Sequence, residues 1–99
     1  MTITATNRLF LRAKPTRDPD GNLLYVFTEA YPASLERQRS LSYIPVPRKG
    51  TISNRWEILV TQSGVRHGML KARDRYGNQH NRALRRIEED HLMKFAIPA

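Results

Sequence analysis

Residues 55–95, RWEILVTQSGVRHGMLKARDRYGNQHNRALRRIEEDHLMKF, decide the fold of this chain. Trp56, Ile58 and Val60 alternate with more polar neighbours over residues 55–61, and a period of two is typical of a β-strand with one buried face. Residues 62–64 end in a glycine, which suits the tight turn of a hairpin. We therefore expect residues 66–73 to return as a second, antiparallel strand.

The second strand has two faces of different character. Arg66, Gly68, Leu70 and Ala72 share one face, and His67, Met69, Lys71 and Arg73 share the other. The first face is mostly small and apolar, whereas the second carries cations. We expect the apolar face to pack on a core and the cationic face to meet solvent or a ligand.

A glycine and an asparagine, Gly77 and Asn78, break the second strand, and Asn78 is suited to cap a helix. Apolar residues then recur at spacings of three and four, which predicts a helix over residues 79–94 with one buried stripe. The stripe consists of Leu84, Ile87, His91 or Leu92, and Phe95. Pairs of opposite charge four residues apart, Arg85 with Glu89 and Arg86 with Asp90, are expected on its surface.

The first forty residues are expected to form a β-hairpin and a connecting segment. Over residues 8–13, alternation places Leu9, Leu11 and Ala13 on one face and Phe10 and Arg12 on the other. Residues 18–21, Asp-Pro-Asp-Gly, predict a type I turn followed by a glycine in the left-handed region, and residues 23–31 resume as a strand.

A short strand is expected over residues 41–46, where Pro45 and Pro47 confine it to a sheet edge. The chain is therefore predicted to be one α+β domain over residues 1–99. Residues 1–40 supply the N-terminal β-hairpin and the connecting segment. Residues 41–99 supply a three-stranded antiparallel sheet packed against one C-terminal helix.

Charge is the strongest signal in the composition. The 99 residues include 17 Lys and Arg against 9 Asp and Glu, a net charge of +8. A polyanion is the natural partner of such a chain, because each phosphate that it neutralises releases condensed counterions. The sequence has no cysteine and no apolar run of the roughly 20 residues that span a bilayer. We expect a cytoplasmic protein with no disulfide, no metal site, no cofactor and no membrane partner.

The central stretch resembles a known family of DNA-binding domains. Its pattern is a tryptophan opening the middle strand, Gly-x-Arg-His after the turn, and Tyr-Gly ahead of Ala-Leu. The residues that carry it are Trp56, Ile58, Val60, Gly64, Arg66, His67, Tyr76, Gly77, Ala83 and Leu84. Residues 43–95 resemble the Apetala-type domain of plant ethylene-response factors and its phage relatives in homing endonucleases and integrase arms.

The resemblance implies duplex DNA binding without catalysis, with the sheet in the major groove and the helix behind it, in a phage or mobile-element setting. It nominates Arg48, Lys49, Arg55, Trp56, Arg66, Lys71 and Arg73, and we add Arg75 from the adjoining turn. The chemistry of the arginines agrees, because a guanidinium can hold guanine or phosphate through two hydrogen bonds. Glu57 is the exception, since it is expected on the same face as the cations. Trp56 also fits a core position, because aromatic side chains dominate burial.

Other interpretations stay open. A helix-turn-helix over residues 54–76 would leave DNA as the partner, although the β-branched residues of 55–61 oppose it. A small inhibitor or adaptor could bind an acidic protein, with the edge strand 41–46 as a pairing template. RNA is a further possible polyanion. A small basic ribonuclease using His67, His80 or His91 is the enzymatic alternative, and we expect no enzyme because the three histidines are scattered.

Overall fold

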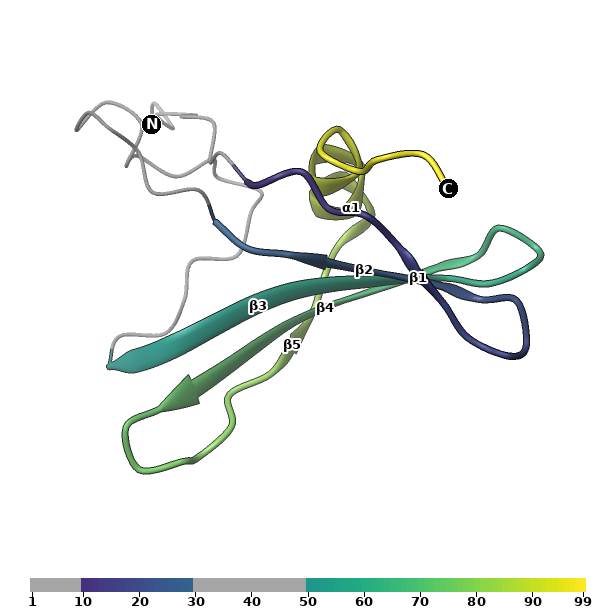
Figure 1. Ribbon diagram of the computed structural model, residues 1–99. Helices are drawn as coiled ribbons and strands as arrows, with labels where there is room; N and C mark the ends of the chain where they lie inside the picture. Colours follow the sequence, from purple (N-terminus) through teal and green to yellow (C-terminus); the bar gives the residue numbers. More distant parts are fainter. Residues whose placement is uncertain (1–9, 30–49) are drawn as a thin grey trace.

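The computed structural model describes residues 10–29 and 50–99. It contains an antiparallel sheet with the strand order β1-β2-β3-β4-β5, and a single described helix, α1, lies on one side of that sheet (Figure 1). The elements are β1 (Thr16–Arg17), β2 (Leu23–Phe27), β3 (Thr51–Val60), β4 (Arg66–Asp74), β5 (Arg82–Ala83) and α1 (Arg86–Met93). The predicted α+β class is confirmed in this form.

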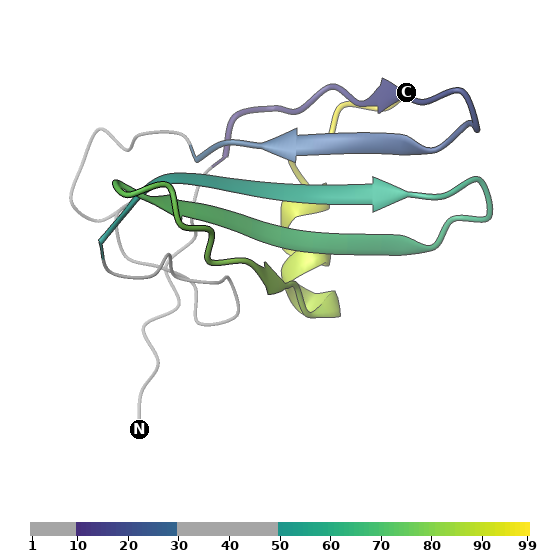
Figure 2. The same ribbon diagram turned by 90° about the horizontal axis from the view of Figure 1, so that it is seen from below.

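The central hairpin is confirmed with both of its faces. β3 and β4 pair with Trp56 opposite Leu70 and Ile58 opposite Gly68. These four residues are buried on the side of α1. Figure 2 shows the opposite side of the sheet, with the helix behind the strands. We call this side the outer face.

Three turns of the sheet share one backbone pattern. In each, a glycine N–H donates to the carbonyl three residues earlier, as Gly77 does to Asp74 at 3.0 Å. The glycine has a positive φ, between 82° and 87° in the three turns, which a side chain would oppose. The turns are residues 18–22, 61–65 and 74–78. All three were expected from their glycines, but the third was also expected to place Asn78 as the cap of a helix.

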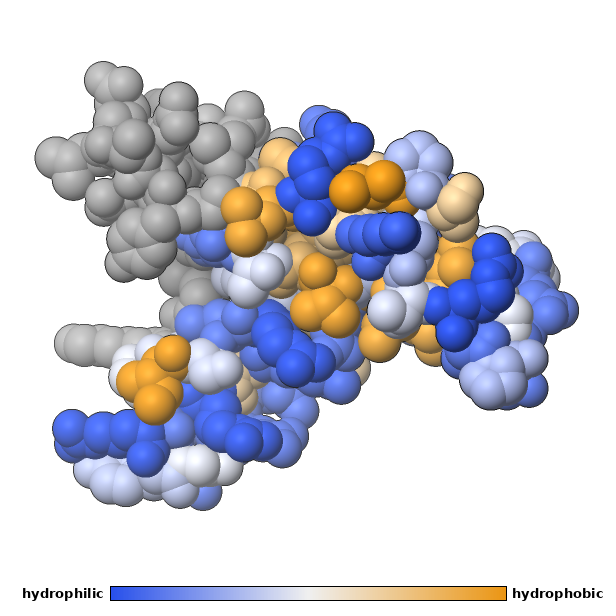
Figure 3. All heavy atoms as spheres, viewed as in Figure 1, coloured by the Kyte–Doolittle hydropathy of each residue, from blue (hydrophilic) through white to orange (hydrophobic). Residues whose placement is uncertain are grey.

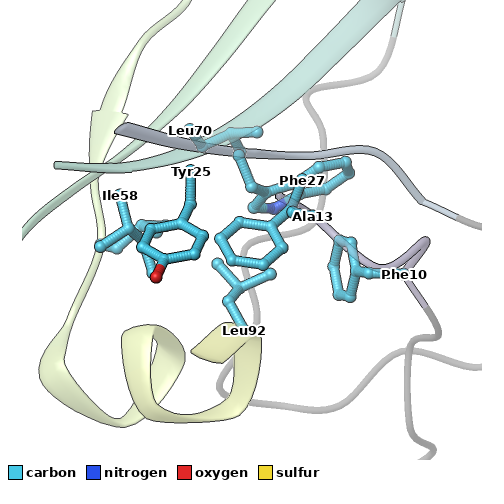
Figure 4. Packing of buried hydrophobic residues seen from close by; sticks show 9 residues of the cluster. Phe10, Ala13, Tyr25, Phe27, Ile58, Leu70 and Leu92 are labelled. Carbon is cyan, nitrogen blue, oxygen red and sulfur yellow. The ribbon is translucent and has the colours of Figure 1, made fainter. Parts of the chain in front are cut away.

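The core lies between the sheet and α1. Phe10, Phe27 and Leu92 face one another there, and Ile58 and Tyr25 extend the cluster along the sheet (Figure 4). Phe27 and Ile58 of the sheet and Leu92 of the helix are 0% exposed, so this part of the core is closed to solvent from both the sheet and the helix. The helix has only 8 residues, too few to be stable by itself, so it is stabilised by the packing of its apolar residues on the sheet.

The helix begins later than predicted, at Arg86 instead of residue 79. Residues 79–84 lie along β4 instead. The N–H of His80 donates to the carbonyl of Ala72 at 2.8 Å, and the N–H of Leu84 donates to the carbonyl of Gly68 at 2.9 Å. Asn78 does not cap the helix. Its N–H donates to the Asp74 carboxylate at 3.0 Å, within the third turn.

The buried face of the helix also differs from the prediction. Ile87 is 50% exposed, while Glu88 and Glu89 are buried, at 0% and 8%. The Glu88 carboxylate accepts the N–H of Arg85 at 2.6 Å, and Glu89 accepts the N–H of Gly68 at 2.8 Å. Polar burial is tolerated here because each carboxylate satisfies a backbone donor.

The ion pairs follow from this arrangement and not from the predicted spacing. Arg82 and Arg85 approach Glu88, with closest N···O distances of 2.8 Å and 3.5 Å. Asp90 pairs with Arg66 of β4 at 2.7 Å. Glu88 and Asp90 therefore connect α1 to β5, to β4 and to the residue that precedes the helix.

The N-terminal strand does not alternate as predicted. Phe10 and Ala13 are buried, and Leu11 is 58% exposed. The reason is that this segment changes partners. The N–H of Leu11 donates to Thr28 at 2.9 Å, whereas the N–H of Ala13 donates to Phe95 at 3.0 Å. Only β1, further along the chain, pairs continuously with β2.

The predicted division into a separate hairpin and a three-stranded sheet is not confirmed. β1 and β2 belong to the same sheet as β3, β4 and β5, and the pairing of β2 with β3 runs over five residues, from Leu23 opposite Val60 to Phe27 opposite Trp56. The edge strand expected at residues 41–46 lies outside the described residues. Within the described part of the chain, α1 is too short to cross a membrane.

Candidate nucleic-acid interface

Three of the predicted cations gather at one end of the outer face. Arg55 of β3 is opposite Lys71 of β4, and Arg73 follows two residues later, opposite Ser53. Side chains two residues apart on a strand share a face, so the three cations point to the same side of the sheet. All three residues are exposed.

A hollow of about 360 Å³ opens between these side chains. We call it the basic hollow, and its lining consists of Ser53, Arg55, Lys71, Ala72, Arg73, Gln79 and Asn81. Three cationic groups, a hydroxyl and two amides therefore surround one space. These groups donate hydrogen bonds, which suits an anion such as a phosphate.

One carboxylate lies among the cations. Glu57 is 7% exposed and forms ion pairs with Arg55 and with Lys71, the latter at 3.1 Å. Burial acts to raise the pKa of Glu57, but hydrogen bonds and charge attraction from Arg55 and Lys71 outweigh it and hold the pKa below its usual value. Glu57 is therefore ionised at neutral pH. Three cations and one anion leave a local charge of +2.

Arg73 differs from its neighbours in having no acidic partner among residues 10–29 and 50–99. Arg55 and Lys71 share Glu57, so part of their charge is already balanced. The guanidinium of Arg73 is the cation of the basic hollow with the least compensation. It is the first candidate for an anion contact.

The turn that follows β4 is held together by the carboxylate of Asp74. Asp74 Oδ1 accepts the N–H groups of Tyr76 at 2.9 Å and Asn78 at 3.0 Å, and Asp74 Oδ2 lies 3.0 Å from His80 Nε2. The hydrogen bond with His80, followed by the bonds from the turn, lowers the pKa of Asp74 to about 2 in spite of partial desolvation. Arg75 projects from this turn over the ring of Tyr76, 5.0 Å from its centroid.

Two predicted contacts lie elsewhere. Trp56 is 2% exposed and packs edge-on against Phe10, with ring centroids 5.1 Å apart. Its ring lies in the core and not beside the arginines, because even-numbered residues of β3 face the helix. Arg66 likewise belongs to the helix side, where it pairs with Asp90. Arg48 and Lys49 lie outside the described residues.

Sequence reasoning missed the amide groups of the site. Gln79 and Asn81 fall in the predicted helix, where their side chains were not expected beside β4. They lie there because the chain turns back after residue 78 and Gln79 forms a bridge with Arg73. Ser53 could have been found by continuing the alternation of β3 backwards from Arg55.

The histidines do not form a common site with the cations. His67 is exposed on the outer face, His80 contacts Asp74, and His91 is buried against Phe10 and Phe95. Among residues 10–29 and 50–99, no group of three His, Cys, Asp or Glu side chains is placed to hold a metal ion.

Comparisons with protein families, with curated proteins and with solved structures found no match for this chain. The resemblance to the Apetala-type domain therefore stays a prediction. The function has to be argued from the geometry of the sheet itself.

Proposed function

We propose that this protein binds double-stranded DNA, without catalysis, through the basic hollow and the turn that adjoins it. The observation that carries the proposal is the meeting of Arg55, Lys71 and Arg73, from two strands, around one polar hollow. Each phosphate that such a group neutralises releases counterions, and this gain does not depend on DNA sequence.

The shape of the site favours a duplex. Residues 51–55 of β3 and 71–74 of β4 extend past β2 and β5 as a two-stranded ribbon, and a ribbon of this kind fits the major groove, which is about 12 Å wide. Arg73 and Arg75 would lie against the phosphates, with the amides of Gln79 and Asn81 beside them. Because these amides can both donate and accept hydrogen bonds, they suit base edges as well as the backbone.

An acidic protein is the second candidate partner. One observation favours it: the outer face next to the cations carries Leu24, Val26, Leu59 and Met69, of which Val26 is 37% exposed and the others are half-buried. A protein would cover this apolar part together with the cations. A duplex would need only the cationic end, so the two partners predict different footprints.

A binding titration tests the proposal. The full chain is titrated against a labelled DNA duplex, a single-stranded RNA and an acidic protein, each at two salt concentrations. Salt-dependent binding that is tightest for the duplex is the expected result. Preferential binding to the acidic protein, weakened by Val26→Ser as well as by Arg73→Ala, would replace DNA by the second candidate. Equal, weak binding to all three would reject a specific duplex site.

A further inference from the structure

The end of the β3–β4 ribbon carries two exposed apolar side chains beside the cations. Ile52 is 71% exposed and Tyr76 is 74% exposed, the highest values among the large apolar residues of the described chain. We call this pair the apolar tip. Both residues line a second hollow, of about 540 Å³, together with Gly50, Thr51, Asp74, Arg75 and His80.

The backbone explains why these side chains are exposed. The pairing of β3 with β4 shifts between Thr51 and Ser53, so Ile52 is the extra residue of a β-bulge. A bulge re-aims a side chain and is frequent beside functional sites. Tyr76 stands at the centre of the third turn, where its N–H is fixed by Asp74. The backbone at these two residues does not have to be ordered on binding, since the bulge and the turn already hold it.

The turn at residues 18–22 provides an internal comparison. Its sequence is DPDGN, and that of the turn at residues 74–78 is DRYGN. In both turns the aspartate side chain accepts two backbone N–H groups, at distances between 2.8 Å and 3.0 Å. The same scaffold thus presents Pro and Asp at one end of the sheet, and Arg and Tyr beside the basic hollow. The Arg-Tyr pair is not needed to form the turn.

Cations flank the apolar tip. Arg73 lines the basic hollow, and Arg75 lines the second hollow and extends over the Tyr76 ring. The carboxylate between them, Asp74, is held by the turn amides and His80, so its lone pairs are directed inward. In Figure 3 this end of the molecule is mostly blue, with an orange patch near the start of β3. An apolar pair bordered by cations matches the stacked bases and flanking phosphates of DNA.

We propose that the apolar tip inserts Ile52 and Tyr76 into a base step of the bound duplex and kinks it. This inference rests on the proposed function and names what the ribbon end does there. The apolar wedges of minor-groove-binding proteins unstack one step and bend the duplex by about 20–90°, and such a bend brings more phosphate against the protein. Arg73 and Arg75 are placed to receive that phosphate.

The test measures DNA bending separately from binding. A duplex of about 20 base pairs, short enough to stay straight by itself, carries a donor dye at one end and an acceptor at the other. Anisotropy reports binding, and energy transfer reports the distance between the ends. Saturation with the wild-type chain is expected to raise energy transfer.

Four variants keep the net charge constant. Ile52→Ser and Tyr76→Ser are expected to abolish the rise in energy transfer, with the slope of log affinity against log salt unchanged. Val65→Ser is the matched control, because Val65 is 50% exposed in the turn at residues 61–65. Tyr76→Phe keeps the ring without the hydroxyl that Arg75 contacts, and it should bend DNA as the wild type does. Thermal unfolding confirms that each variant is folded.

The outcomes separate the two proposals. Two results would overturn insertion and leave the proposed function standing. One is duplex binding with no rise in energy transfer. The other is a rise in energy transfer that persists in both Ile52→Ser and Tyr76→Ser. The absence of duplex binding by the wild type overturns both. Loss of bending in Ile52→Ser and Tyr76→Ser, with bending retained in Val65→Ser and Tyr76→Phe, supports insertion.

Discussion

The backbone N–H of Gly68 donates a hydrogen bond to the carboxylate of Glu89 at 2.8 Å, joining the middle of β4 to the helix. A Cβ at position 68 would lie 2.8 Å from atoms of both Glu89 and Leu84. The close approach of strand and helix thus depends on a glycine whose φ is ordinary. Glycine is therefore required at position 68 by the space between strand and helix, and not by the backbone conformation.

Gly68→Ala is expected to lower the free energy of unfolding by about 1–3 kcal/mol, the cost of overpacking a filled site. Urea denaturation measures the change. An unchanged midpoint would mean that α1 lies further from β4 than the structure places it.

The burial of the helix is tested by two of its apolar residues. Leu92 is 0% exposed and Ile87 is 50% exposed. Leu92→Ala should cost about 2–5 kcal/mol of stability, as a cavity-forming substitution. Ile87→Ala serves as the control and should stay within about 0.5 kcal/mol. A large loss of stability on Ile87→Ala would mean that Ile87 is buried, as the stripe predicted from the sequence requires.

Arg73 should contribute to the salt dependence of DNA binding. Arg73→Ala is expected to weaken duplex binding and to reduce the slope of log affinity against log salt by about 0.9, one phosphate contact. Arg86→Ala is the matched control, because Arg86 is exposed at the start of α1, on the other side of the sheet. Equal effects of the two substitutions would show that only net charge matters and would remove the basic hollow from the interface.

Glu57 should restrain DNA binding. Glu57→Gln raises the local charge from +2 to +3 and releases Arg55 and Lys71 from their ion pairs. We expect tighter duplex binding at low salt and a smaller difference at high salt, where screening is strong. Asp90→Asn removes a carboxylate that pairs with Arg66, away from the outer face, and provides the comparison. A gain in affinity from Asp90→Asn as large as that from Glu57→Gln would contradict the proposed position of the site.

The carboxyl group of Asp74 in the third turn should affect stability at low pH. The pKa of Asp74 is about 2 in the folded protein, below the ordinary value of 3.8. Ionised Asp74 therefore stabilises the fold above pH 3.8, and this contribution is lost as the pH falls from 3.8 through about 2. His80→Ala removes the largest cause of the shift, so the pKa of Asp74 should move towards 3.8. NMR titration of the Asp74 carboxyl measures it, and His67→Ala should leave it unchanged.

Local pattern was enough to predict the central hairpin. Alternation in residues 55–61 and 66–73 is a property of neighbouring residues, and it placed Lys71 and Arg73 on the exposed face and Leu70 and Ala72 on the buried one. Glycine signals placed the turns at Gly21, Gly64 and Gly77 for the same reason, because the demand for a positive φ is local.

Long-range pairing defeated the prediction of the helix. Residues 79–84 fit a helical pattern, but the N–H groups of His80 and Leu84 donate to carbonyls of β4, from Ala72 and Gly68. The same pairing brings Gln79 and Asn81 to the basic hollow, so those site residues were missed together with the helix start. Trp56 was placed among the DNA contacts through a resemblance, whereas strand alternation alone puts it in the core with Ile58.

The strands at the two edges of the sheet, β1 and β5, are only two residues long, while the longest strands, β3 and β4, lie inside it. A second molecule that sought to extend the sheet would find few aligned backbone groups at either edge. The net charge of +8 adds mutual repulsion at low salt. Within its described part, the chain can therefore expose a partly apolar sheet face without offering a template for growth into aggregates.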